Sequence, residues 1–142
     1  MRARTPGSAP FASLRHELQT LEAALNALGA VGRRSDGWSV GEILAHTADL
    51  AEVFCERLSP GTFPTAVTTA IRDSAGHIDL ARTNEVLRQA HGSDPIHTSL
   101  ARLDRCFQAA ASVHPDGNPF WLQRLDAHTR EHLREVWALR SR

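Results

Sequence analysis

Apolar residues recur at alternating spacings of three and four along this chain, and this period restricts its fold more than any other feature. Such spacing places the apolar side chains on one face of a helix. Four long stretches show it, and they cover residues 11–28, 43–54, 96–110 and 122–139. We find no strand pattern beside them. We therefore predict an all-α protein whose four long helices form a four-helix bundle.

Residues that start and stop helices support these boundaries. Ser39 and Glu42 have the spacing of a capping box, in which each side chain accepts a hydrogen bond from the other residue's backbone amide. The run Ser59-Pro60-Gly61 predicts the end of that helix. The other long helices are expected to begin at Pro10, at Ser93-Asp94-Pro95 and at Asn118-Pro119.

The remaining segments suggest one domain with two irregular parts. Residues 1–9, rich in Arg, Gly, Ser and Pro, are predicted to be a disordered leader, and residues 10–142 a single domain. Residues 59–81 form a long crossover between the second and third long helices. A short helix is expected from about Arg82 to His91, ended by Gly92. We find no internal repeat in the sequence.

The composition excludes several classes of function. Sixteen basic and 16 acidic side chains give a formal net charge of zero, whereas nucleic-acid surfaces normally carry a basic excess. All 16 basic residues are arginine, so Schiff-base chemistry on a lysine is excluded. Cys55 and Cys106 fall within predicted helices and are expected to be buried thiols.

No apolar run reaches the length of about 18 residues that a membrane span needs. No apolar run of signal-peptide length follows the basic first residues. We therefore expect a cytoplasmic protein with neither a membrane nor a nucleic acid as partner.

Two histidines lie on the predicted apolar face of the last helix. Burying a polar ring without a partner costs roughly 1–3 kcal/mol, so two such rings on one face need a shared explanation. Side chains four residues apart lie about 5–6 Å apart at Cβ, so both rings can reach one metal ion. A hydrogen-bonded core pair is the alternative. Thr129 stands where the zincin motif has glutamate. The face comprises Leu122, Leu125, His128, His132, Val136 and Leu139.

A third histidine favours the metal site over the core pair. His46 shares a face of the second helix with Leu50 and Val53, and it is therefore turned toward the bundle. Three imidazole ligands leave one coordination position open, which is typical of catalytic zinc. Imidazole also suits nickel, iron and copper, so the ligands do not identify the metal. We predict a divalent metal bound by His46, His128 and His132.

Two segments resemble the signature segments of the DinB/YfiT-like superfamily. Residues 38–54, WSVGEILAHTADLAEVF, are similar to its Trp-Ser-x-x-Glu-x-x-x-His segment, which opens the second helix. Residues 125–136, LDAHTREHLREV, are similar to its His-x-x-x-His segment on the fourth helix. The resemblance implies a four-helix bundle, a homodimer, and a divalent metal, often nickel or zinc, on His46, His128 and His132. Residues 1–10 and 59–81 match no pattern of that family.

Other polar and aromatic residues are weaker candidates. Glu131 is a candidate general base or ring-orienting residue, although a solvated helix face also explains it. Asp49, three residues after His46, is a candidate for orienting that ring. The capping box better explains Glu42. Packing is the simplest role for Trp121 and Trp137. Surface or turn positions are expected for His16, His77, His91, His97 and His114.

Three functions remain open at this point. The first is a metal-dependent enzyme acting on a small-molecule substrate, with zinc, nickel or iron as the metal. The resemblance implies a hydrolase, or a transferase that uses a low-molecular-weight thiol. The second is a bundle that binds a small molecule without catalysis, and the third is a structural protein whose histidines form a core network. We favour the first.

Overall fold

The computed structural model describes residues 9–29, 32–66 and 71–140, and this part of the chain contains five helices and no strand. The all-helical prediction is therefore confirmed. Each predicted helix is present, and its ends lie within two residues of those expected. The predicted leader falls largely on residues 1–8, which lie outside the described residues. The helices are α1 (Ala9–Leu28), α2 (Val40–Leu58), α3 (Leu80–His91), α4 (Ile96–Val113) and α5 (Pro119–Arg140).

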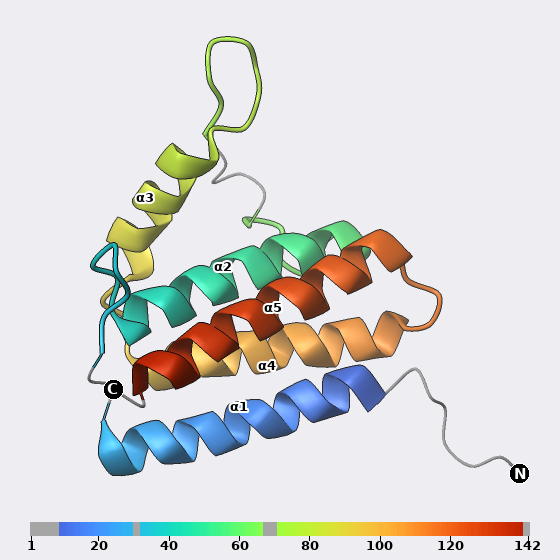
Figure 1. Cartoon of the computed structure of the whole chain (residues 1–142). Helices are drawn as coiled ribbons and strands as arrows, with labels where there is room; N and C mark the ends of the chain where they lie inside the picture. Colours follow the sequence, from blue (N-terminus) through green and yellow to red (C-terminus); the bar gives the residue numbers. More distant parts are fainter. Residues whose placement is uncertain (1–8, 30–31, 67–70, 141–142) are drawn as a thin grey trace, which may run out of the picture.

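The four long helices α1, α2, α4 and α5 lie side by side as a bundle (Figure 1). α2 and α4 run parallel, since Glu52 pairs with Arg102 and the Cys55 thiol donates to the carbonyl of Cys106 farther along both helices. Parallel neighbours cannot be joined by a tight turn. The chain therefore returns through residues 59–79 and α3 before α4 begins, as the predicted crossover requires.

α3 lies outside the bundle against α2, and the segment before it projects away from the other helices (Figure 1). Only Thr83 and Leu87 of α3 are buried. Leu80 and Val86 remain 64% and 46% exposed. This helix consequently forms one wall of a recess along α2 rather than a part of the main core.

The main core contains the apolar stripes expected from the sequence. Its completely buried side chains include Leu14, Leu21, Leu103, Phe107 and Leu125. Cys55 and Cys106 are also buried, as predicted. A hydrogen bond to Cys55, together with burial, raises the pKa of the Cys106 thiol. No helix in the described ranges is long and apolar enough to cross a membrane.

The capping box at the start of α2 is confirmed. Ser39 Oγ accepts a hydrogen bond from the Glu42 amide at 3.1 Å, and Glu42 Oε1 accepts one from the Ser39 amide at 2.9 Å. The start of α4 differs from the prediction. The residue that precedes this helix is Pro95, and no side chain caps it. The Asp94 amide instead donates to the carbonyl of His91, which places Asp94 in the turn that ends α3.

Replacing Ser39 with alanine is expected to lower the free energy of unfolding by about 1 kcal/mol, because the Glu42 amide loses its acceptor. Chemical denaturation at neutral pH measures this change. Ser35→Ala is the matched control, since Ser35 is exposed in the same loop. Equal stability of the two variants would contradict the capping role.

Two turns of the same form precede α2 and α3, although the sequence alone indicated no repeat. Each reads Arg-x-Ser-x-Gly, and each is closed by an isolated β-bridge. Arg33 Nη1 donates to the carbonyl of Gly37 at 2.9 Å, and Arg72 Nη1 donates to that of Gly76 at 2.8 Å. Both glycines have positive φ, 93° and 84°, a conformation that favours glycine. The first turn reaches the site described next.

Candidate metal centre

Three histidines from two helices meet inside the bundle. His46 comes from α2, and His128 and His132 come from successive turns of α5. The centroid of the His46 ring lies 5.4 Å from that of His128 and 4.9 Å from that of His132, and the two rings of α5 are 4.5 Å apart. One nitrogen from each ring lies within 4.8 Å of the other two. The structure therefore brings together all three histidines singled out in the sequence.

The distance between the two α5 rings fits a shared ion. The Nε2 atoms of His128 and His132 are 3.2 Å apart. Two nitrogens bound to one zinc at about 2.0–2.1 Å, with a tetrahedral angle between them, lie about 3.3–3.4 Å apart. The same 3.2 Å also permits a hydrogen bond between neutral rings. The spacing of these two nitrogens thus already fits a shared divalent metal.

The protonation of these rings also suits a metal. Burial, followed by the charge of His132, lowers the pKa of His46 to about 4 and the pKa of His128 to about 3. Both rings are therefore neutral at pH 7 and keep a nitrogen lone pair. Their Nδ1 atoms are buried with no hydrogen-bond partner among the described residues. Leaving such atoms unpaired costs about 1–3 kcal/mol each, and buried unpaired groups call for an explanation such as a functional site.

Glu135 orients the third ring, a role that the sequence analysis considered for Glu131. Glu135 Oε1 lies 2.7 Å from Nδ1 of His132. A proton on Nδ1 leaves the lone pair on Nε2, the atom that faces His128. Glu131 is exposed on α5, and its proposed role as a general base stays a prediction. The sequence analysis missed Glu135, although its spacing of three residues from His132 is a helical neighbour spacing that could have indicated this contact.

Aromatic side chains enclose the histidines. Trp38 packs edge to face with His46, and Phe54 packs edge to face with His128. The ring centroids are 5.6 Å apart in both pairs. Trp121 stacks on Phe54 at 6.0 Å. The predicted packing role of Trp121 therefore holds, and the residue also extends the wall beside His128. Such an apolar surrounding strengthens electrostatic interactions at the site.

Asp49 does not orient His46, the role considered for it from the sequence. Its Oδ1 lies 2.9 Å from Nδ1 of His91 and 2.6 Å from Nη2 of Arg102. Asp49 thus joins α2 to α3 and α4 at a place separate from the three histidines. His91, expected at the surface or in a turn, is half-buried and paired. Within the described ranges, His46, His128 and His132 form the one cluster with metal-binding geometry.

An apolar pocket of about 90 Å³ lies between α2, α3 and the segment that joins them. Leu50 and Val53 line it, and they follow His46 on the same face of α2 at helical spacing. Among the described residues that line it, Arg57 and Arg72 are the charged ones and none is a carboxylate. The pocket and His46 therefore share one face of one helix.

Comparisons with known proteins give no further identification. No protein-family model matches the chain, and neither curated proteins nor solved structures give a significant match.

Proposed function

We propose that this chain is a divalent-metal-binding, DinB-like protein that acts as a metal-dependent enzyme on a small molecule. The observation that carries the proposal is the arrangement of the two α5 rings. Their Nε2 atoms face each other at 3.2 Å, while Nδ1 of His132 is held by Glu135. His46 adds a third neutral ring from α2. A core network would instead be expected to satisfy the buried Nδ1 atom of His46.

Zinc, nickel and iron are the metals that we propose, since imidazole suits all three. Three protein ligands leave a position for substrate, as in catalytic rather than structural sites. A bound divalent ion supplies Lewis-acid chemistry, by polarising a substrate atom or by lowering the pKa of water or of a thiol. The residues of the chain orient the ligands and enclose the site with aromatic rings.

The surroundings of the site favour a thiol-dependent transferase over a hydrolase. Glu135, the carboxylate that contacts a ligand ring, is already engaged by His132 and by Arg34. It is therefore a poor general base, and hydrolysis has more need of one. The apolar pocket beside Leu50 and Val53 suits an apolar group on the substrate. The homodimer and the cytoplasmic location stay predictions.

Metal analysis of the purified chain tests the proposal. We expect close to one divalent ion per chain, and His128→Ala should bind it at least 100-fold more weakly, an order-of-magnitude expectation for a lost ligand. His97→Ala is the matched control, because His97 is an exposed histidine on α4. A parent chain without metal, or equal binding by both variants, would overturn the proposed site. A screen of low-molecular-weight thiols with electrophilic acceptors then tests the reaction.

A further inference from the structure

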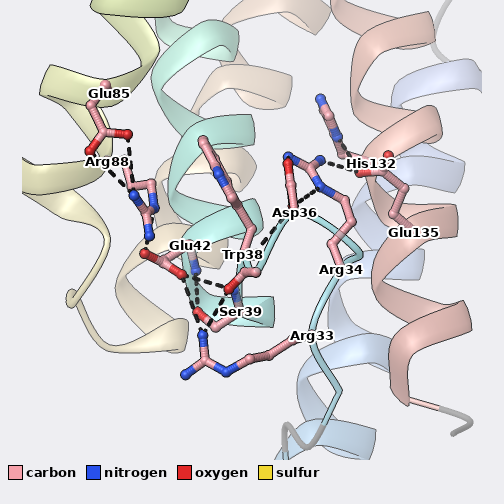
Figure 2. Close-up of polar contacts among 11 residues, drawn as sticks. Arg33, Arg34, Asp36, Trp38, Ser39, Glu42, Glu85, Arg88, His132 and Glu135 are labelled. Atoms are coloured by element: carbon pink, nitrogen blue, oxygen red, sulfur yellow. Dashed lines mark hydrogen bonds and ion pairs between the residues drawn. The ribbon is translucent and has the colours of Figure 1, made fainter.

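We propose that Arg34, in the turn before α2, is a positioning residue for the metal centre and sets its affinity through Glu135. The inference rests on the proposed function, because it concerns the same three histidines. Arg34 lies outside the helices that carry them, and Figure 2 shows its guanidinium group beside Glu135 and His132.

The first connection runs through Glu135. Arg34 Nε and Nη2 donate to the two carboxylate oxygens of Asp36 at 3.0 and 2.8 Å. This two-point contact within one turn fixes the plane of the guanidinium group. Its Nη1 then donates to Glu135 Oε1 at 3.2 Å. The same oxygen contacts Nδ1 of His132 at 2.7 Å. Arg34 thus holds the carboxylate that holds the ligand ring.

The second connection runs through Trp38. Cζ of Arg34 lies 4.9 Å from the centroid of the Trp38 ring, and Cζ of Arg88 lies 5.4 Å from it. Figure 2 shows Trp38 between these two arginines. Trp38 held in this position makes the edge-to-face contact with His46. One turn therefore restrains the ligand from α2 and one ligand from α5.

The neighbouring arginine shows why this arrangement is more than a surface ion pair. The Arg33 side chain is 67% exposed, and within the described part of the chain its polar contacts are Gly37 of its own turn and, at 3.9 Å, Glu42. The Arg34 side chain is 27% exposed. Ion pairs at such partly exposed positions contribute about 0–1 kcal/mol to stability. Groups that orient metal ligands, in contrast, change metal affinity about 10–100-fold when they are removed. Loss of Arg34 should therefore affect metal binding more than folding.

Cobalt binding provides the test, since Co²⁺ reports both affinity and ligand geometry through its visible absorption. Each metal-free full-length variant is titrated with Co²⁺ against a competing chelator. We expect Arg34→Met to bind about 10-fold more weakly or worse and to change the absorption spectrum. Arg34→Lys keeps the charge but lacks the planar fork, so it should lie between this variant and the parent. Arg33→Met is the control and should match the parent.

A double-variant cycle separates positioning from a general effect. If Arg34 acts through Glu135, most of the affinity change caused by Arg34→Met should disappear in a Glu135→Gln background. Parent-like affinity and spectrum in Arg34→Met, or full additivity with Glu135→Gln, would overturn the inference and leave the metal site intact. No Co²⁺ binding by the parent would overturn the proposed function as well. If Arg34→Met does not fold, the same comparisons with Arg34→Lys decide the question.

Discussion

Replacing Arg102 with methionine is expected to lower the free energy of unfolding by about 3–5 kcal/mol, because it leaves a carboxylate buried without its strongest partner. The Asp49 side chain is 4% exposed and lies 2.6 Å from Arg102 Nη2. Arg102 also pairs with Glu52 at 2.9 Å. After the substitution, His91 is the remaining contact of Asp49. Burial already raises the pKa of Asp49, against the opposing effects of Arg102 and His91.

Chemical denaturation at pH 7 measures this loss, and two further variants interpret it. Arg105→Met removes an exposed arginine from the same helix, where it lies over Phe63, and it should cost less than about 1 kcal/mol. Asp49→Asn combined with Arg102→Met should recover part of the stability, since no buried charge is then left alone. If Arg102→Met lowers the free energy of unfolding by less than about 1 kcal/mol, the Asp49–Arg102 pair contributes little to stability.

The features predictable from the sequence are those set by residues close together along one helix. The apolar period located the four long helices, and the Ser39–Glu42 spacing identified a cap that forms within four residues. The same period predicted that His46 and the two histidines of α5 face the bundle. Side chains that face the bundle from two different helices can meet in its core, which is why the histidine cluster could be predicted from the sequence.

The features missed depend on contacts between elements. Arg34 reaches Glu135 from a turn, and no local pattern encodes that contact. Asp49 lies three residues after His46, yet its carboxylate is engaged by His91 at the end of α3 and by Arg102 on α4. Asp94 was expected to start α4, but it lies in the turn after α3, and the residue that precedes α4 is Pro95. Glu135 is the exception, since its helical spacing from His132 made the contact predictable.

Acid should destabilise the metal-free chain through His46 and His128. Their folded-state pKa values, about 4 and about 3, lie below the value near 6.5 of an unfolded histidine. As the pH falls below 6.5, the unfolded chain binds protons that the folded chain does not. The contribution of the two rings to the free energy of unfolding is therefore fully present above pH 6.5. It decreases as the pH approaches 4 and levels off below pH 3. Linkage gives an upper value of about 3 kcal/mol for each ring between pH 7 and pH 4.

Comparing the parent with His128→Leu isolates this contribution from that of the carboxylates. Both chains are unfolded by urea in the presence of a chelator, at several pH values from 7 to 4. The carboxylates titrate in both proteins, so the difference between the two profiles reports His128. We expect the variant to lose less stability on acidification, by up to about 3 kcal/mol, because leucine binds no proton in either state. Parallel profiles would mean that His128 titrates alike in folded and unfolded chains. That outcome would contradict the burial of this ring beside Phe54.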